Sequence, residues 1–286
     1  MPPPWRSTLL LHGIRAITGG QGPPLILLPG WSQTAEAYNN IFEPLSKRYQ
    51  FFALDPPGLG DSSAPVNGYD TDNVSRIMAE AIHDIVKDKT YHLVGHDVGG
   101  WIAYPWAAQF QSRLKSLSIL DAGVPGFMPS IQFPLSNAAN LRLWQFSFNA
   151  LPELPEILTQ GRERELLTWF FKLKTVKTER FSKDHFERYI QAYSRPGAMS
   201  RGFEYYRAFE TSARQNLEFA KTRLDLPVLA LGGESSVGEG MVDLVKKFAA
   251  NVEGGVIGEC GHFLPEEQPD VVAEKLLEFL EKNDTK

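Results

Sequence analysis

The chain has 286 residues, of which 43% are hydrophobic and 22% are charged, and its formal net charge is −5. This composition is typical of a globular protein that forms one large α/β domain, alone or with a smaller insert. The mild charge and the lack of a Lys/Arg cluster argue against nucleic acid, and no apolar run reaches the length of a membrane span. We therefore expect a small-molecule substrate and water as partners, no nucleic acid and no membrane, and we leave self-association open.

The cysteine content and the first residues bear on location. The sequence contains one cysteine, Cys260, so no internal disulfide can form, which fits a reducing compartment. The first twenty residues lack the layout of a secretory signal, because His12 interrupts their apolar run. We predict a cytoplasmic location.

Strands and helices are predicted to alternate through the first half of the chain. A helix starting at Thr71 is expected to use Thr71 or Asp72 as its N-cap. Strands separated by helices predict a mostly parallel sheet covered by helices on both faces. The predicted elements are a hairpin over 7–20, strands over 23–30, from 50, over 91–96 and 114–123, and helices over 34–49, 71–88 and 98–111.

The pattern changes after the sixth predicted strand. From about 124 to 220 the apolar residues fall at helical spacing and aromatic residues are dense, which predicts a helical cap inserted into the core. The alternation then resumes with a strand over 226–233, a helix over 241–252, a strand over 254–259 and a helix over 269–282. The predicted division is a core domain of residues 1–123 and 221–286, with a cap of residues 124–220.

A short motif follows the predicted strand 91–96. The stretch Gly95-His96-Asp97-Val98-Gly99 matches the G-x-S-x-G elbow of α/β-hydrolases, with Asp97 in the place of the nucleophilic serine. Such an elbow needs small residues on both sides, which Gly95 and Gly99 supply. The alternative interpretation is that Asp97 is only an N-cap of the following helix.

A nucleophile at Asp97 would need a base and an acid that follow it in the chain. His262 lies after the last predicted strand, where such a fold presents its base, whereas the other five histidines lie inside predicted elements or beside the elbow. Asp121 and Glu234 compete as the acid. Asp121 is favoured because the usual acid position after the later strand is occupied by Ser236.

Two backbone N–H groups are expected to form an oxyanion hole, those of Trp31 and Val98. We expect no cofactor and no metal.

Several of these motifs together carry a family resemblance. "GHDVGG", "LDPPGLGDSS", "ILDAGVPG" and "CGHFLPEEQP" resemble the epoxide hydrolases and dehalogenases of the α/β-hydrolase superfamily. The similarity is greatest to Cif-type epoxide hydrolases, above all over 202–233 and 143–148, and it extends over nearly the whole chain after about residue 20.

The resemblance implies the α/β-hydrolase fold and a two-step reaction. Asp97 would attack a substrate carbon to form an ester, and His262, oriented by Asp121, would activate the water that hydrolyses it. The second Tyr of "EYYR", Tyr206, matches a cap residue that protonates the opened epoxide. The family's second such residue, a His, is replaced by Gln145, which donates hydrogen bonds but delivers no proton at neutral pH.

The resemblance implies an epoxide hydrolase that forms a diol from an apolar small molecule, and other functions stay open. Haloacetate dehalogenases carry Arg residues just after the nucleophile, and haloalkane dehalogenases typically carry a Trp there, where this chain has Val98. A hydrolase of esters or lactones, or a non-catalytic binding protein of the same fold, are further alternatives. The identity and stereochemistry of the substrate are not predicted.

Overall fold

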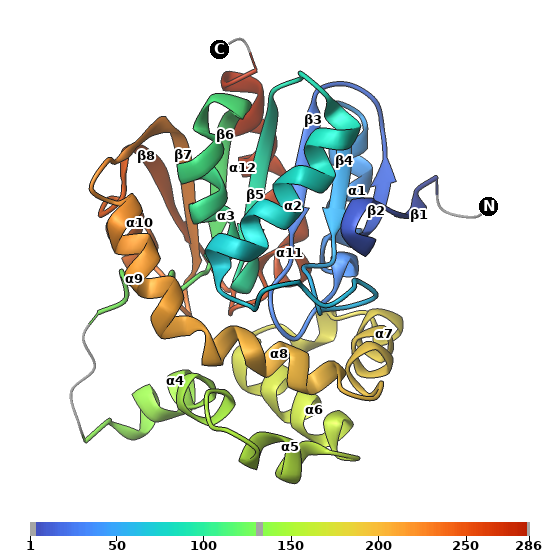
Figure 1. Ribbon diagram of the computed structural model, residues 1–286, viewed down its shortest axis with the longest axis vertical. Coiled ribbons are helices and arrows are strands. Elements are labelled where there is room, and N and C mark those ends of the chain that lie inside the picture. Colours follow the sequence, from blue (N-terminus) through green and yellow to red (C-terminus); the bar gives the residue numbers. More distant parts are fainter. Residues whose placement is uncertain (1–3, 130–133, 285–286) are drawn as a thin grey trace.

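The computed structural model describes residues 4–129 and 134–284. Within these residues, eight strands form one sheet in the order β1-β2-β4-β3-β5-β6-β7-β8, in which β1, β2 and β4 pair antiparallel and all later neighbours pair parallel (Figure 1). The strands are β1 (Arg6–Leu9), β2 (Arg15–Gly19), β3 (Pro24–Leu28), β4 (Gln50–Leu54), β5 (Tyr91–His96), β6 (Leu114–Leu120), β7 (Leu224–Gly233) and β8 (Ala249–Ile257).

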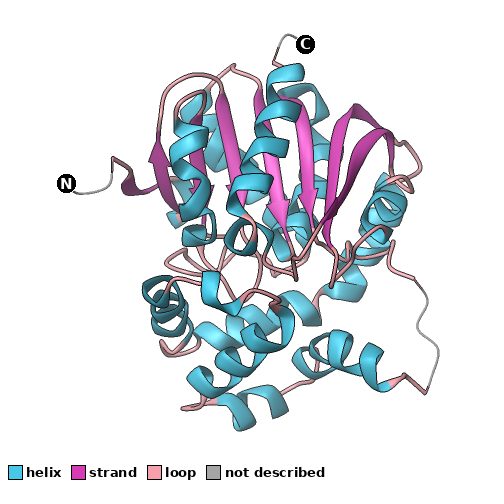
Figure 2. Cartoon of the chain, turned by 180° about the vertical axis from the view of Figure 1, so that it is seen from behind, coloured by secondary structure: helices cyan, strands magenta, loops and turns pink. Residues whose placement is uncertain are grey.

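Helices cover both faces of the sheet, as the sequence predicts (Figures 1 and 2). Side chains of β3 alternate between the two faces: Ile26 and Leu28 pack with α2 and α3, whereas Leu25 and Leu27 pack with α1 and α12. The covering helices are α2 (Thr71–Val86), α3 (Val98–Phe110) and α10 (Gly240–Val245) on one face, and α1 (Asn39–Ser46), α11 (Leu264–Glu267) and α12 (Pro269–Lys282) on the other.

A helical segment interrupts the chain between β6 and β7, and we call residues 137–219 the helical insert. It lies beyond the carboxyl ends of the parallel strands (Figure 1). Its helices are α4 (Asn137–Asn149), α5 (Leu154–Thr159), α6 (Glu163–Lys174), α7 (Lys183–Tyr193), α8 (Ala198–Arg207) and α9 (Phe209–Phe219). Ligands of open α/β folds bind at these strand ends, so the insert covers the expected site.

Three local predictions differ from the structure. The helix expected over 34–49 is a 3-10 helix, Ala35–Tyr38, followed by the shorter α1. The N-cap of α2 is Asp70, whose side chain accepts from the Asn73 N–H at 3.1 Å, and not Thr71 or Asp72. The helix expected over 241–252 ends at Val245, because residues from Ala249 onward pair with β7. Strand pairing therefore overrides local helix propensity there.

Candidate active site

The turn between β5 and α3 has the backbone of a nucleophile elbow. Asp97 has a φ of 49°, and a Cβ on Gly95 or Gly99 would lie within 2.3 Å of a backbone oxygen. Asp97 occupies the N-cap position of α3, but its side chain makes no capping hydrogen bond. The interpretation of Asp97 as a simple N-cap is therefore wrong, and the turn holds its carboxylate toward the insert.

The loop after β3 reaches this carboxylate, because β3 is the neighbour of β5 in the sheet. The Trp31 N–H donates to Asp97 Oδ1 at 3.0 Å. A hydrogen bond from the Val98 N–H helps to lower the Asp97 pKa. The two backbone groups expected to form an oxyanion hole thus both point at Asp97. Gly30 is required beside them, since a Cβ there would lie 2.3 Å from Asp97 Cβ.

His262 lies between two carboxylates from different strand ends. Its Nδ1 is 2.7 Å from Asp121 Oδ1, at the end of β6, and its Nε2 is 3.4 Å from Asp97 Oδ2. The first distance is that of a charge-assisted hydrogen bond, and the second is a longer charge contact. The structure thus brings together Asp97, Asp121 and His262, which are far apart in the sequence.

Asp121 is held by backbone and side-chain donors at the end of β7 and in the loop after it. The Gly233 N–H donates to Oδ2 at 2.7 Å, and the Ser236 hydroxyl donates to Oδ1 at 2.6 Å. Ser236, at the usual acid position, therefore supports the acid that comes from β6. Glu234 is exposed, and its carboxylate accepts from the Glu259 N–H at 2.8 Å. The geometry favours Asp121 over Glu234 as the partner of His262.

The pKa values in the site follow from the position of His262 between Asp97 and Asp121. Burial alone would lower the His262 pKa, but the hydrogen bonds and charges of Asp121 and Asp97 raise it to about 9. Burial would raise the Asp97 pKa, yet His262 keeps it below its ordinary value. At neutral pH the site therefore holds an ionised Asp97 beside an imidazolium.

His96 has a supporting position behind His262. Burial lowers the His96 pKa to about 4, so its ring is neutral. Its Nε2 donates to the backbone oxygen of His262 at 2.7 Å, since a carbonyl can only accept. His96 therefore fixes the base loop and does not line the cavity.

A cavity of about 140 Å³ opens onto Asp97 and His262. It is similar in size to a cavity of about 150 Å³ that holds benzene in another protein. Its wall combines Asp97, Asp121 and His262 with apolar side chains and with two basic residues of the insert, Arg142 and Lys174. The lining residues are Asp97, Asp121, Gly123, Met128, Leu141, Arg142, Leu143, Gln145, Phe146, Leu173, Lys174, Ser235, Ser236, Val237 and His262.

The two residues of the insert that the resemblance selected have different positions. Gln145 is on α4, is buried and lines the cavity. Tyr206 is on α8 and is not among the described residues that line the cavity: its ring is 5.8 Å from that of Phe146 and 5.6 Å from that of Trp31. Burial raises the Tyr206 pKa well above its ordinary value, and the Asp97 charge adds to this. Tyr206 is therefore protonated.

Sequence reasoning missed two residues that shape the site. Lys174, at the end of α6, reaches the cavity, and its backbone oxygen accepts from the His262 N–H at 2.9 Å. The buried carboxylate of Glu267 accepts from the N–H groups of Gly261 and Phe263, on both sides of His262, and of Val176. The contacts of Lys174 with His262 and of Glu267 with Val176 have no local signal, because each joins segments that are distant in the chain.

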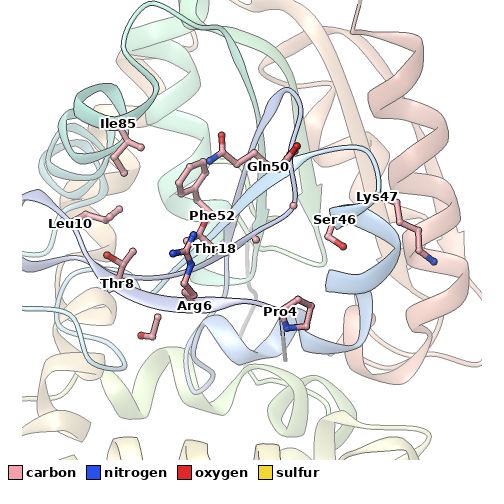
Figure 3. A pocket seen from close by; sticks show the side chains of 14 residues that line it. Pro4, Arg6, Thr8, Leu10, Thr18, Ser46, Lys47, Gln50, Phe52 and Ile85 are labelled. Carbon is pink, nitrogen blue, oxygen red and sulfur yellow. The ribbon is translucent and has the colours of Figure 1, made fainter. Parts of the chain in front are cut away.

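A larger hollow, of about 1040 Å³, lies elsewhere on the described surface (Figure 3). Side chains from β1, β2 and the end of α1 line it, among them Arg6, Thr18 and Lys47. Its lining residues in the described part of the chain include no carboxylate, histidine or cysteine. The candidate nucleophile and base line the smaller cavity instead.

Among the described residues, no helix combines the length and apolarity that crossing a membrane requires.

Comparison with known proteins agrees with the fold described above. The α/β hydrolase fold family matches residues 23–269. A soluble epoxide hydrolase of Corynebacterium sp. (strain C12) is 30% identical, over 94% of this chain and 95% of that protein. A fluoroacetate dehalogenase of Burkholderia sp. is 25% identical, over 93% and 90%. The crystal structure of wild-type Cfl2 from Burkholderia cenocepacia superimposes with a TM-score of 0.89 at 34% identity, covering 96% of this chain and 95% of that one.

Proposed function

The chain belongs to the α/β-hydrolase fold family, in the branch of epoxide hydrolases and dehalogenases, and we propose that it is an epoxide hydrolase with Asp97 as nucleophile. The observation that carries this proposal is an ionised carboxylate on a strained elbow, 3.4 Å from the imidazole of His262. A carboxylate attacks an electrophilic sp³ carbon without prior deprotonation, since its ordinary pKa is about 4.

In the first step, an Asp97 oxygen bonds to one epoxide carbon while the ring C–O bond breaks. The product is an ester of Asp97 and an alkoxide, which takes a proton from Tyr206. Gln145 orients the ring oxygen through its amide N–H. The alkylated Asp97 no longer carries a charge, so one cause of the high His262 pKa disappears. The imidazolium then releases a proton, which replaces the one that Tyr206 gave to the alkoxide.

In the second step, His262 Nε2 accepts a proton from water, and the hydroxide attacks the ester carbonyl carbon of Asp97. Asp121 orients the ring and stabilises its charged form. The Trp31 and Val98 N–H groups receive the oxyanion of the tetrahedral intermediate. Collapse of this intermediate breaks the ester bond and leaves Asp97 as a carboxylic acid beside an alkoxide. His262 gives the alkoxide the proton that it took from water and then takes the proton of the Asp97 carboxyl group. This restores the carboxylate and the imidazolium, and the diol departs.

Trapping of the ester tests the proposal. In H262Q the first step proceeds without a base for the second, so the peptide containing Asp97 should gain the mass of the substrate. An unmodified peptide, under conditions in which the wild type turns over, would contradict the mechanism. A single turnover of wild type in ¹⁸O-water should place the label in Asp97, whereas label directly in the diol would indicate attack by water.

A second candidate is dehalogenation. It is favoured by one observation: Tyr206 is absent from the described cavity lining, and Gln145 there supplies no proton. A halide leaving group needs no proton. Turnover of an alkyl halide without turnover of any epoxide would select this function.

A further inference from the structure

Two basic side chains of the insert enter the cavity that contains Asp97. Lys174 Nζ donates to the backbone oxygen of Arg142, lies 3.5 Å from Gln145 Oε1 and sits 5.6 Å from the ring centre of Phe170. The guanidinium of Arg142 donates to the backbone oxygen of Ser236. Within residues 4–129 and 134–284, no carboxylate lies within 4.0 Å of either cation.

Two basic side chains without a carboxylate partner are costly in the absence of a ligand. Partial burial of an ammonium with no counter-ion costs free energy, and burial here lowers the Lys174 pKa to about 8. With His262 as an imidazolium, the basic groups around the cavity exceed the carboxylates of Asp97 and Asp121 by one charge. One anionic group on a ligand would balance the cavity.

The remaining wall defines the rest of the ligand. Leu141, Leu143, Phe146, Leu173 and Val237 contribute apolar surface around a volume of about 140 Å³. A fitting molecule therefore combines a small apolar body with one negative charge.

We propose that the cavity selects small electrophiles that carry a carboxylate, with Lys174 as the main counter-ion and Arg142 at the mouth. This inference rests on the proposed function, because it names the substrate class of that same site. It assigns Lys174 to recognition and not to the bond-making steps.

Binding of an inert matched pair tests the inference without any turnover. Benzoate and benzamide have nearly the same shape and differ in charge. By calorimetry at pH 7, the wild type should bind benzoate about 10- to 100-fold more tightly than benzamide, the range expected for a hydrogen bond to a charged group. K174M should abolish this ratio. K172M, which removes a charge from an exposed position on the same helix, should retain it.

The outcomes that overturn the inference are distinct. Equal binding of the two probes by wild type would mean that the basic groups only offset the acids of the site. A ratio that survives in K174M would exclude Lys174 as the counter-ion. An equal loss of affinity for both probes in K174M would show a packing role.

The pH dependence adds a readout that packing would not change. Lys174 loses its charge as the pH rises through about 8, so the benzoate preference of wild type should fall between pH 7 and 9. K174R should keep the preference, because Arg stays protonated. His262, Asp97, Asp121 and Arg142 also face Lys174, but they are common to both proteins. Identical profiles for wild type and K174R would overturn the inference.

The same variants separate this inference from the proposed function. Glycidate and glycidamide form a matched pair of small epoxides, and the wild type should favour glycidate in kcat/KM by a factor that collapses in K174M. If neither epoxide is turned over while the benzoate preference stands, epoxide hydrolysis fails and carboxylate recognition holds. If both epoxides are turned over equally well by the wild type, epoxide hydrolysis holds and carboxylate recognition fails.

Discussion

Asp121 receives hydrogen bonds from three donors at the end of β7 and in the loop after it, and from His262, whereas Glu234 receives none from the histidine. We expect D121N to slow hydrolysis of the alkyl-enzyme ester by about 10³–10⁴-fold, because the imidazole loses its orientation and the stabilisation of its charged form. E234Q, at an exposed position, should stay within a few-fold of wild type. Single-turnover kinetics of ester decay measures both. A fast D121N together with an inactive E234Q would reverse the assignment.

Tyr206 and Gln145 are predicted to differ in the size of their effects. Y206F should slow ester formation from an epoxide by about 10²–10⁴-fold, the loss typical of a general acid. Q145A should cost about 1–3 kcal/mol, near the value of one hydrogen bond. Q145H should be tolerated or increase activity on simple epoxides. Rapid-quench measurement of the ester gives these rates, and an alkyl halide is the control, since its leaving group needs no proton. Unchanged epoxide turnover in Y206F would contradict this role.

Residues with a motif could be singled out from the sequence, whereas residues whose role depends on tertiary contacts could not. Asp97 and His262 have Gly-flanked loops and a fixed chain order, and the structure brings them together. Ser236 was noted only as a non-acid, yet its hydroxyl holds Asp121. Lys174 resembles any basic residue near a helix end until α6 is placed against the base loop.

At the scale of elements, Glu267 joins the helical insert to the base loop. Its carboxylate accepts N–H groups from Val176 and Lys177, after α6, and from Gly261 and Phe263, on both sides of His262. We expect E267A to lower the free energy of unfolding by about 1–3 kcal/mol, because buried donors lose their acceptor. Decay of the ester should slow more than its formation, since His262 acts as base only in the second step.

Urea denaturation and single-turnover kinetics measure the two effects of E267A. E259Q is the matched control: Glu259 is exposed and pairs with Lys177 at 2.6 Å, so its loss should leave stability unchanged within error. If both steps slow equally in E267A, Glu267 supports the fold alone and does not position the base.

Elements with strong local patterns were predicted best. The periodicity of residues 71–88 and 269–282 locates α2 and α12 within a few residues. The start of β8 was missed, because its first residues have helix-compatible side chains and become a strand only by pairing with β7. The spatial strand order also depends on such pairing, so the sequence predicted the parallel sheet but not its order.

At the scale of the whole molecule, buried Glu266 links three parts of the fold. Its carboxyl group, on α11, accepts from the Gln33 amide in the loop after β3 and from the Tyr189 hydroxyl of α7 at 3.0 Å. Burial raises the Glu266 pKa to about 8, although both donors oppose this. The folded protein therefore binds a proton that the unfolded chain releases above about pH 4.5.

A raised folded-state pKa fixes the sign of the pH dependence. The contribution of Glu266 is fully present below about pH 4.5 and is lost as the pH rises toward 8. The contribution of His262 is present below about pH 6.5 and is lost as the pH rises through about 9. From the raised pKa values of both groups, we expect the free energy of unfolding to fall from pH 5 to pH 9.

E266Q should remove the first part of this fall, because the amide does not titrate. Relative to wild type, the variant should gain more than about 1 kcal/mol between pH 5 and pH 8, since one pKa unit corresponds to about 1.4 kcal/mol. Urea denaturation at pH 5, 6, 7 and 8 gives the two curves. E274Q removes a charge from an exposed position on α12, and its curve should run parallel to that of wild type. A parallel curve for E266Q would mean that the three-way contact holds an ionised carboxylate in the folded protein.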